Sequence, residues 1–193
     1  MKVFGIDPGS ARTGYGCVQS DGIRHTLVAY GAISIPLSNP FPEKLQIIHA
    51  ALASLLSKHR PDCVAIENLF HAMNARSALK LGHARGVAML AAVEAGLPIV
   101  EYTPAEVKQA VVGYGRAEKH QVQSMIQLLL GLAAPPSPFD AADALAIAVT
   151  HLHRMNLPGG LARTARGSDS AAGRGLTRRE KSPQRGSWRS YRP

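Results

Sequence analysis

The chain has 193 residues, of which 46% are hydrophobic, a length and composition typical of one globular domain with room for an extension. Its formal net charge of +9 is concentrated at one end, because residues 156–193 carry nine Lys and Arg against two Asp and Glu. No apolar run reaches the roughly 18 residues of a membrane span, and the first residues lack a secretory signal pattern. We therefore expect a cytoplasmic protein that does not associate with a membrane.

The first part of the chain predicts three strands. Short apolar segments at residues 2–7 and 15–20 stand on either side of the turn-forming sequence PGSARTG, and a longer strand follows over residues 23–35. The dipeptide Asp21-Gly22 before this third strand favours a tight hairpin turn. An antiparallel arrangement of the three strands follows.

The middle of the chain alternates helices with short buried strands. The 3.6-residue spacing of apolar side chains indicates helices, and two continuous apolar runs that follow helices indicate parallel strands. Hairpin strands followed by βαβ units predict an α/β fold with a mixed five-stranded sheet flanked by helices. The expected helices cover residues 41–59, 74–95, 104–112, 118–130 and 139–154, and the expected parallel strands cover residues 62–67 and 98–102.

A change in composition marks the end of the predicted domain. Residues 156–193 are rich in Gly, Arg and Ser and contain few large apolar side chains. Such a segment buries too little surface to offset the entropy of ordering. We expect a folded domain of residues 1–155 and a basic, disordered C-terminal tail that attracts polyanions.

Four acidic residues occupy positions that the predicted elements would bring together. Asp7 directly follows the first strand and Glu67 follows a later one, so parallel pairing of these strands would place both carboxylates at one edge of the sheet. Asp140 and Asp143 are three residues apart at the start of the last helix and share a face. Such a cluster requires cations, and oxygen ligands suit Mg²⁺ or Mn²⁺. Two such ions can activate water and stabilise the leaving oxygen in phosphodiester hydrolysis.

Each acid taken alone also has an ordinary explanation. Asp7 in Asp-Pro-Gly can build a turn, and Glu67 can be a solvated residue at a strand end. Asp140 fits the third position of a helix capped by Ser137. Asp143 is harder to explain in this way because it lies further into an apolar helix. The conjunction of the four favours a metal site.

Five segments together identify a family. FGIDPGSARTGYG, AIENLF, SALKLGHARGVAM, VKQAVVGYGRAEKHQVQ and DAADALAIAVTH closely resemble the RuvC family of crossover junction endodeoxyribonucleases, in the family's order and over roughly residues 1–155. The resemblance implies a ribonuclease-H-like fold and a homodimer that resolves four-way (Holliday) DNA junctions in recombination and repair by paired, Mg²⁺-dependent nicking. It implies a RuvA–RuvB branch-migration complex as partner. It also implies the catalytic acids, Asp7, Glu67, Asp140 and Asp143.

Basic and aromatic residues provide candidate DNA contacts. Lys108, Arg116 and Lys119 surround a glycine-bearing loop that can approach phosphates closely. In the family that the chain resembles, lysines at the positions of Lys108 and Lys119 are functionally important. The resemblance also implies that Phe70 stacks on an unpaired base near the crossover, although a core phenylalanine fits the sequence too. Arg76 is a candidate phosphate contact in the same region.

Other functions and assemblies remain open on the sequence alone. A junction-binding protein without cleavage would not need four acids, and an actin-like nucleotide-binding enzyme would need a second lobe. A related nuclease for other branched or RNA-containing substrates is the remaining alternative. For the homodimer, residues Ala78, Gly82 and Gly86 form a small-residue track that permits close helix approach. The same track could equally pack on the chain's own sheet.

Overall fold

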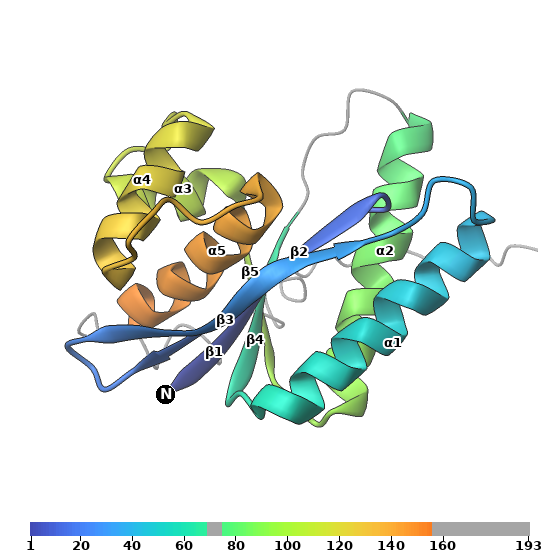
Figure 1. Ribbon diagram of the computed structural model, residues 1–193, viewed down its shortest axis with the longest axis horizontal. Helices are drawn as coiled ribbons and strands as arrows, with labels where there is room; N and C mark the ends of the chain where they lie inside the picture. The colour runs from blue at the N-terminus through green and yellow to red at the C-terminus, as the bar shows by residue number, and fades with distance from the viewer. Residues whose placement is uncertain (69–74, 156–193) are drawn as a thin grey trace, which may run out of the picture.

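A five-stranded mixed sheet forms the centre of the molecule. The structure, a computed structural model, describes residues 1–68 and 75–155 (Figure 1). The strand order is β3-β2-β1-β4-β5, with β3, β2 and β1 antiparallel and with β4 and β5 continuing from β1 in parallel. The predicted mixed sheet is therefore confirmed. The strands are β1 (Lys2–Asp7), β2 (Arg12–Ser20), β3 (His25–Ser34), β4 (Cys63–Glu67) and β5 (Ile99–Tyr102).

The second strand is longer than the sequence indicated. It begins at Arg12, which pairs with Ser34, whereas the sequence predicted a turn up to Gly14. Gly14 has the character of a turn residue in the sequence, but in the structure it lies in the sheet opposite Asp7. A side chain at this position would collide with the backbone of a helix that lies on the sheet.

Helices cover the two faces of the sheet unequally (Figure 1). Two long helices pack against each other on one face, and a third helix lies directly on the other face beneath two shorter ones. The first pair is α1 (Phe41–His59) and α2 (Ala75–Glu94), and the second group is α3 (Pro104–Val112), α4 (Lys119–Leu130) and α5 (Phe139–Met155). None of the described helices is long and apolar enough to span a membrane.

Helix α5 is buried on all sides rather than along one stripe. Every residue from Ala144 to Leu152 is buried, because the sheet covers one side of the helix and α3 and α4 cover the others. Two glycines permit this close packing. A Cβ on Gly5 would lie 2.0 Å from the Ala144 carbonyl oxygen, and one on Gly14 would lie 1.9 Å from that of Asp140. The start of α5 therefore rests on the backbone of β1 and β2.

The start of α5 differs by one residue from the sequence interpretation. The Pro138 carbonyl accepts a 3.2 Å hydrogen bond from the Ala142 amide, so Pro138 rather than Ser137 is the N-cap. Asp140 is consequently the second helical residue and not the third. The interpretation of Asp140 as the third residue of a helix capped by Ser137 is therefore wrong.

Candidate active site

The ends of two parallel strands bring Asp7 and Glu67 together. The β1–β4 ladder runs to the pair Ile6 and Ile66, so the next residues along each strand, Asp7 and Glu67, are neighbours at the same edge of the sheet. Burial, followed by the negative charge of Asp143, raises the pKa of Glu67, while its interaction with the Asp7 side chain partly offsets the rise. The sequence-based placement of both acids at one sheet edge agrees with this geometry.

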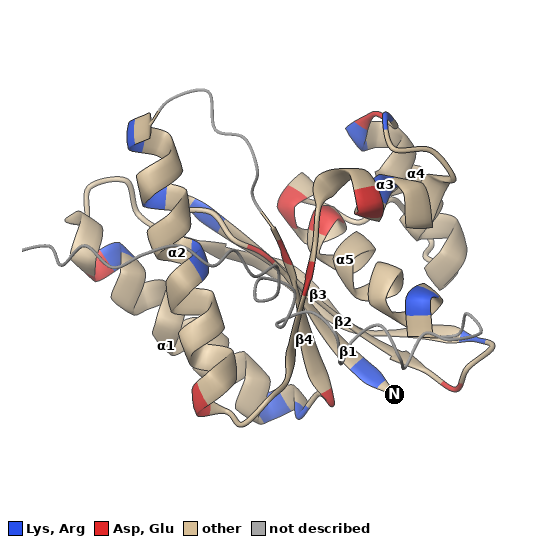
Figure 2. Ribbon diagram, turned by 180° about the vertical axis from the view of Figure 1, so that it is seen from behind, with Lys and Arg blue, Asp and Glu red and all other residues tan. Residues whose placement is uncertain are grey.

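The first turns of α5 add the other two acids. Asp143 raises the pKa of both Asp7 and Glu67 through its negative charge, and Asp140 raises that of Asp7 and of Asp143. Charge interactions therefore link Asp7 to each of the other three acids and link Asp143 to Glu67 and Asp140. Figure 2 shows acidic segments converging where the central strands end against the start of α5, between α2 and the α3–α4 pair.

Burial and mutual repulsion disfavour negative charge in this cluster. Burial, followed by the charge of Glu67, raises the pKa of Asp7 from its ordinary 3.8 to about 8. Burial is also the main cause that raises the pKa of Glu67 and of Asp143. Without added cations, these effects favour a proton retained by the Asp7–Glu67 pair at neutral pH. A positively charged species that binds here would remove this penalty.

Two cations of the chain are paired with the acids of α5. Lys119 lies with Nζ 3.3 Å from an Asp143 carboxylate oxygen, and Arg12 lies with Nη1 3.5 Å from one of Asp140. Asp143 is the main cause of a raised pKa for Lys119. Burial raises the pKa of Glu67 and Asp143, and the positive charge of Lys108 is near enough to reduce that rise slightly. Among the described residues, no three His, Cys, Asp or Glu side chains already form a metal-binding group.

Capping interactions explain why the lysines face the acids. Thr103 caps α3, accepting a hydrogen bond from the Glu106 amide while the Glu106 side chain accepts one from the Thr103 amide. Glu118 is the N-cap of α4, and its amide donates a 2.8 Å hydrogen bond to the Gln121 side-chain oxygen, which makes Lys119 the first residue of that helix. These local sequence signals fix where both helices begin, and so place Lys108 and Lys119 beside the carboxylates.

The remaining DNA-contact candidates lie around this edge. Arg116 is exposed in the connection between α3 and α4, and Arg76 is exposed in the first turn of α2. Figure 1 shows the start of α2 on the opposite side of the strand ends from α3 and α4. Phe70 and the basic tail lie outside the described residues. Arg12 was not identified from sequence, because its place in the PGSARTG segment indicated a turn.

Comparison with known proteins identifies the family. The family model described as crossover junction endodeoxyribonuclease RuvC matches residues 3–151. The crossover junction endodeoxyribonuclease RuvC of Koribacter versatilis is 54% identical over 155 residues, covering 79% of this chain and 93% of that protein. The protein of the same name from Syntrophomonas wolfei is 49% identical over 157 residues, covering 81% and 91%.

Solved structures agree with the sequence comparisons. The RuvC of T. thermophilus in complex with a Holliday junction substrate is 39% identical, with a TM-score of 0.77 over 81% of this chain and 95% of that one. The yeast mitochondrial Holliday junction resolvase Ydc2, at 14% identity and a TM-score of 0.55, shares the fold. The predicted ribonuclease-H-like fold is thereby confirmed. This chain belongs to the RuvC family of crossover junction endodeoxyribonucleases.

Proposed function

We propose that the chain resolves four-way DNA junctions by metal-dependent phosphodiester hydrolysis at Asp7, Glu67, Asp140 and Asp143. The observation that carries this assignment is the convergence of the four carboxylates, where burial and repulsion raise the pKa of Asp7 to about 8. A structural role for these acids would not explain so unfavourable a grouping. Family membership supplies the substrate class, and the four acids supply a site at which the cut can occur.

The carboxylates have the chemistry of ligands for Mg²⁺, with Mn²⁺ as a substitute. Oxygen ligands at the strand ends and on the first turns of α5 would hold two ions, since four carboxylates bring four negative charges. When bound, the ions supply an activated water and neutralise charge on the leaving oxygen. The chain itself contributes the fixed positions of the four acids, because Gly5 and Gly14 bring α5 against β1 and β2.

Basic residues on both sides of the carboxylates would hold the DNA backbone. Lys108 and Lys119 lie on the α3–α4 side together with Arg116, and Arg76 lies on the α2 side. Phosphate contacts of this kind orient a nucleic acid without reading its bases. We expect them to set the position of the scissile phosphate. Phe70 stays a candidate for stacking at the crossover.

The outer face of α2 supports the proposed homodimer. Leu79, Leu90 and Val93 are 64%, 50% and 63% exposed, and a groove of about 610 Å³ runs past Gly82 and Gly86 between α1 and α2. Nothing lies within 4 Å of a Cβ built on either glycine. The core-facing side of α2 is instead formed by alanines, Ala84, Ala88, Ala91 and Ala92. Packing of the glycine track on the chain's own sheet is therefore excluded.

A two-fold homodimer would supply the two sites that paired nicking requires, because resolving a junction cuts one strand in each of two duplexes. Gly82→Leu tests the contact. Open space around Gly82 predicts a folded variant by circular dichroism that sediments as a monomer at micromolar concentration. A variant that remains dimeric would place the interface elsewhere.

The family's RuvA–RuvB complex is a further proposed partner, and residues 156–193 are proposed to add non-specific DNA affinity.

The substrate assignment is tested by incubating the protein with Mg²⁺ and matched four-way junction, linear duplex and RNA–DNA hybrid substrates. Paired nicks in the junction, with the other two substrates left intact, are expected. Binding without cleavage, or preferential cutting of the hybrid, would contradict the proposal.

A further inference from the structure

Arg12 occupies a position beside the acids that mirrors that of Lys119. Its guanidinium lies 3.5 Å from Asp140, while Lys119 lies 3.3 Å from Asp143. The two acids are one turn apart on α5, and their cationic partners come from different elements, β2 and α4. Asp140 and Asp143 therefore each have a separate cationic partner. Arg12 is the partner that comes from β2.

The Arg12–Asp140 ion pair is weak enough for Arg12 to leave Asp140 and bind another anion. The side chains are 50% and 35% exposed, and 3.5 Å is longer than the 2.7–2.9 Å typical of a charge-assisted hydrogen bond. Such a half-exposed ion pair contributes little to folding. The backbone that carries it is fixed, because Gly14 of β2 packs directly against the Asp140 carbonyl. Arg12 thus stays beside Asp140 while its side chain is free to turn.

We propose that Arg12 changes partner when the site is loaded, leaving Asp140 for a phosphate of the DNA. The inference rests on the proposed function, in which Asp140 is a metal ligand. A divalent cation bound to Asp140 would coordinate its carboxylate oxygens and repel the Arg12 guanidinium. The displaced guanidinium presents a planar fork of donors that matches phosphate oxygens. Arg12 is then a phosphate contact on the β2 side, across the acids from Lys119.

Metal affinity without DNA gives the first test. Mn²⁺ is titrated calorimetrically into the full chain and into Arg12→Ala, Arg12→Lys, Asp140→Asn and Arg24→Ala. Arg24→Ala is the matched control, since it removes one exposed positive charge from the β2–β3 turn, away from the acids. Removal of the competing charge predicts about three- to tenfold tighter Mn²⁺ binding by Arg12→Ala. Arg12→Lys and Arg24→Ala should bind as the parent does.

Junction binding gives the second test. Fluorescence anisotropy with a four-way junction is measured in EDTA and in Ca²⁺, which takes oxygen ligands, with gel analysis to verify that the DNA is uncut. Arg12→Ala should weaken binding several-fold more in Ca²⁺ than in EDTA. Its log–log salt slope should become shallower by about one only in Ca²⁺, because one fewer phosphate is neutralised. Arg12→Lys should lose less affinity than Arg12→Ala.

The outcomes separate this inference from the proposed function. If Asp140→Asn weakens Mn²⁺ binding but Arg12→Ala does not strengthen it, the partner exchange is wrong and the ligand set stands. Equal losses of junction affinity in EDTA and Ca²⁺ would likewise overturn the exchange, since they indicate a permanent phosphate contact. If Asp140→Asn binds Mn²⁺ as the parent does, Asp140 is not a ligand, and both proposals are wrong. Thermal unfolding verifies that each variant is folded.

Discussion

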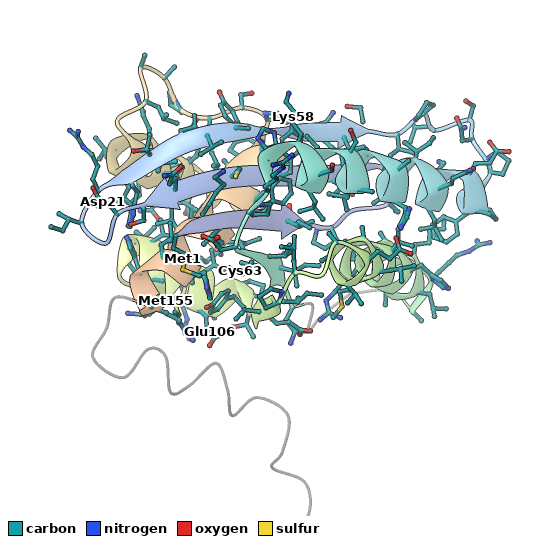
Figure 3. The ribbon with its side chains drawn as sticks, turned by 90° about the horizontal axis from the view of Figure 1, so that it is seen from below. Met1, Asp21, Lys58, Cys63, Glu106 and Met155 are labelled. Atoms are coloured by element: carbon teal, nitrogen blue, oxygen red, sulfur yellow. The ribbon has the colours of Figure 1, made fainter. Side chains whose placement is uncertain are left out.

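The two ends of α5 bury polar groups in opposite ways. At its C-terminal end, the Tyr102 hydroxyl and His151 Nδ1 form a buried 2.8 Å hydrogen bond. Arg154 donates a 2.9 Å hydrogen bond to Glu106 and lies over the Tyr102 ring. Figure 3 shows Glu106 and Met155, labelled on neighbouring helices at this end. At the N-terminal end, four carboxylates gather and one of them keeps a proton at neutral pH.

This difference separates a structural network from the proposed active site. At the C-terminal end the Tyr102–His151 and Arg154–Glu106 pairs are complementary, so the fold gains connections between β5, α3 and α5. At the N-terminal end like charges face one another, and only Lys119 and Arg12 offset them through ion pairs among the described residues. Clusters of like charge with strongly shifted pKa values occur most often at catalytic and binding sites. The comparison predicts that substitutions at the two ends change stability in opposite directions.

The largest expected change in stability is a gain from Asp7→Asn in metal-free protein. Because the pKa of Asp7 rises from 3.8 unfolded to about 8 folded, the folded state retains a proton that the unfolded state has lost between these pH values. The free energy of unfolding therefore falls as pH rises from about 4 to about 8. Asparagine does not ionise, so the Asp7→Asn variant should not show this fall in the free energy of unfolding. The substitution should stabilise the protein by roughly 2–4 kcal/mol at about pH 8, with little effect at about pH 4.

Urea unfolding in EDTA at both pH values measures this effect. Asp21→Asn is the control, because backbone amide groups of the hairpin turn lower the pKa of that exposed carboxylate. Its stabilising contribution is present at neutral pH and disappears as pH falls through the folded pKa, so the control should change stability in the opposite direction. A destabilised Asp7→Asn at the higher pH would mean that the acids are not in electrostatic conflict.

A smaller loss is expected at the C-terminal end. Tyr102→Phe removes the partner of His151, which is 2% exposed, and leaves a buried nitrogen unsatisfied. The expected cost is about 1–3 kcal/mol in the free energy of unfolding, with junction cleavage by the folded protein unchanged. Tyr114→Phe is the matched control, since its hydroxyl bonds Gln121 at an exposed position. Equal effects of both substitutions would show that the buried bond has no special importance.

The smallest effect on the folded domain should come from removing the basic segment after α5. A chain ending at Asn156 should unfold at the same temperature and cut junctions at the same rate as the full chain. Its affinity for linear duplex should be lower and less dependent on salt, since nine basic residues are lost. Loss of folding or of junction cleavage would move the proposed domain boundary and make residues 157–193 part of the enzyme.

The sequence predicted the elements because their signals are local. The Asp21-Gly22 turn and the apolar periods of the helices required no knowledge of tertiary contacts. It did not predict that β2 begins at Arg12, because glycine in a strand resembles a turn unless the helix above it is known. The burial of residues 144–152 of α5 on every side has no local signal either, since it depends on α3 and α4, which pack against the helix from elsewhere in the chain.

The site was predictable in part. Strand ends and helical spacing indicated where the four acids would lie, and the family resemblance implied a catalytic role that stays a prediction. The pairing of Arg12 with Asp140 joins residues 128 positions apart and has no local signal. In the sequence, Arg12 is a single basic residue in a segment that otherwise resembles a turn, so nothing there indicates this ion pair. Ion pairs between distant segments depend on packing, which a single sequence does not display.

The most direct test of the proposed active site is junction cleavage by Asp7→Asn, Glu67→Gln, Asp140→Asn and Asp143→Asn. Single-turnover rates with Mg²⁺ and a four-way junction are compared with junction affinity measured in EDTA. We predict that each variant loses cleavage by about a thousandfold or more, because each would remove a proposed ligand of the catalytic ions. Junction affinity should be unchanged or higher, since negative charge is removed. A variant that cuts at the parent rate would contradict the assignment of that carboxylate to the active site.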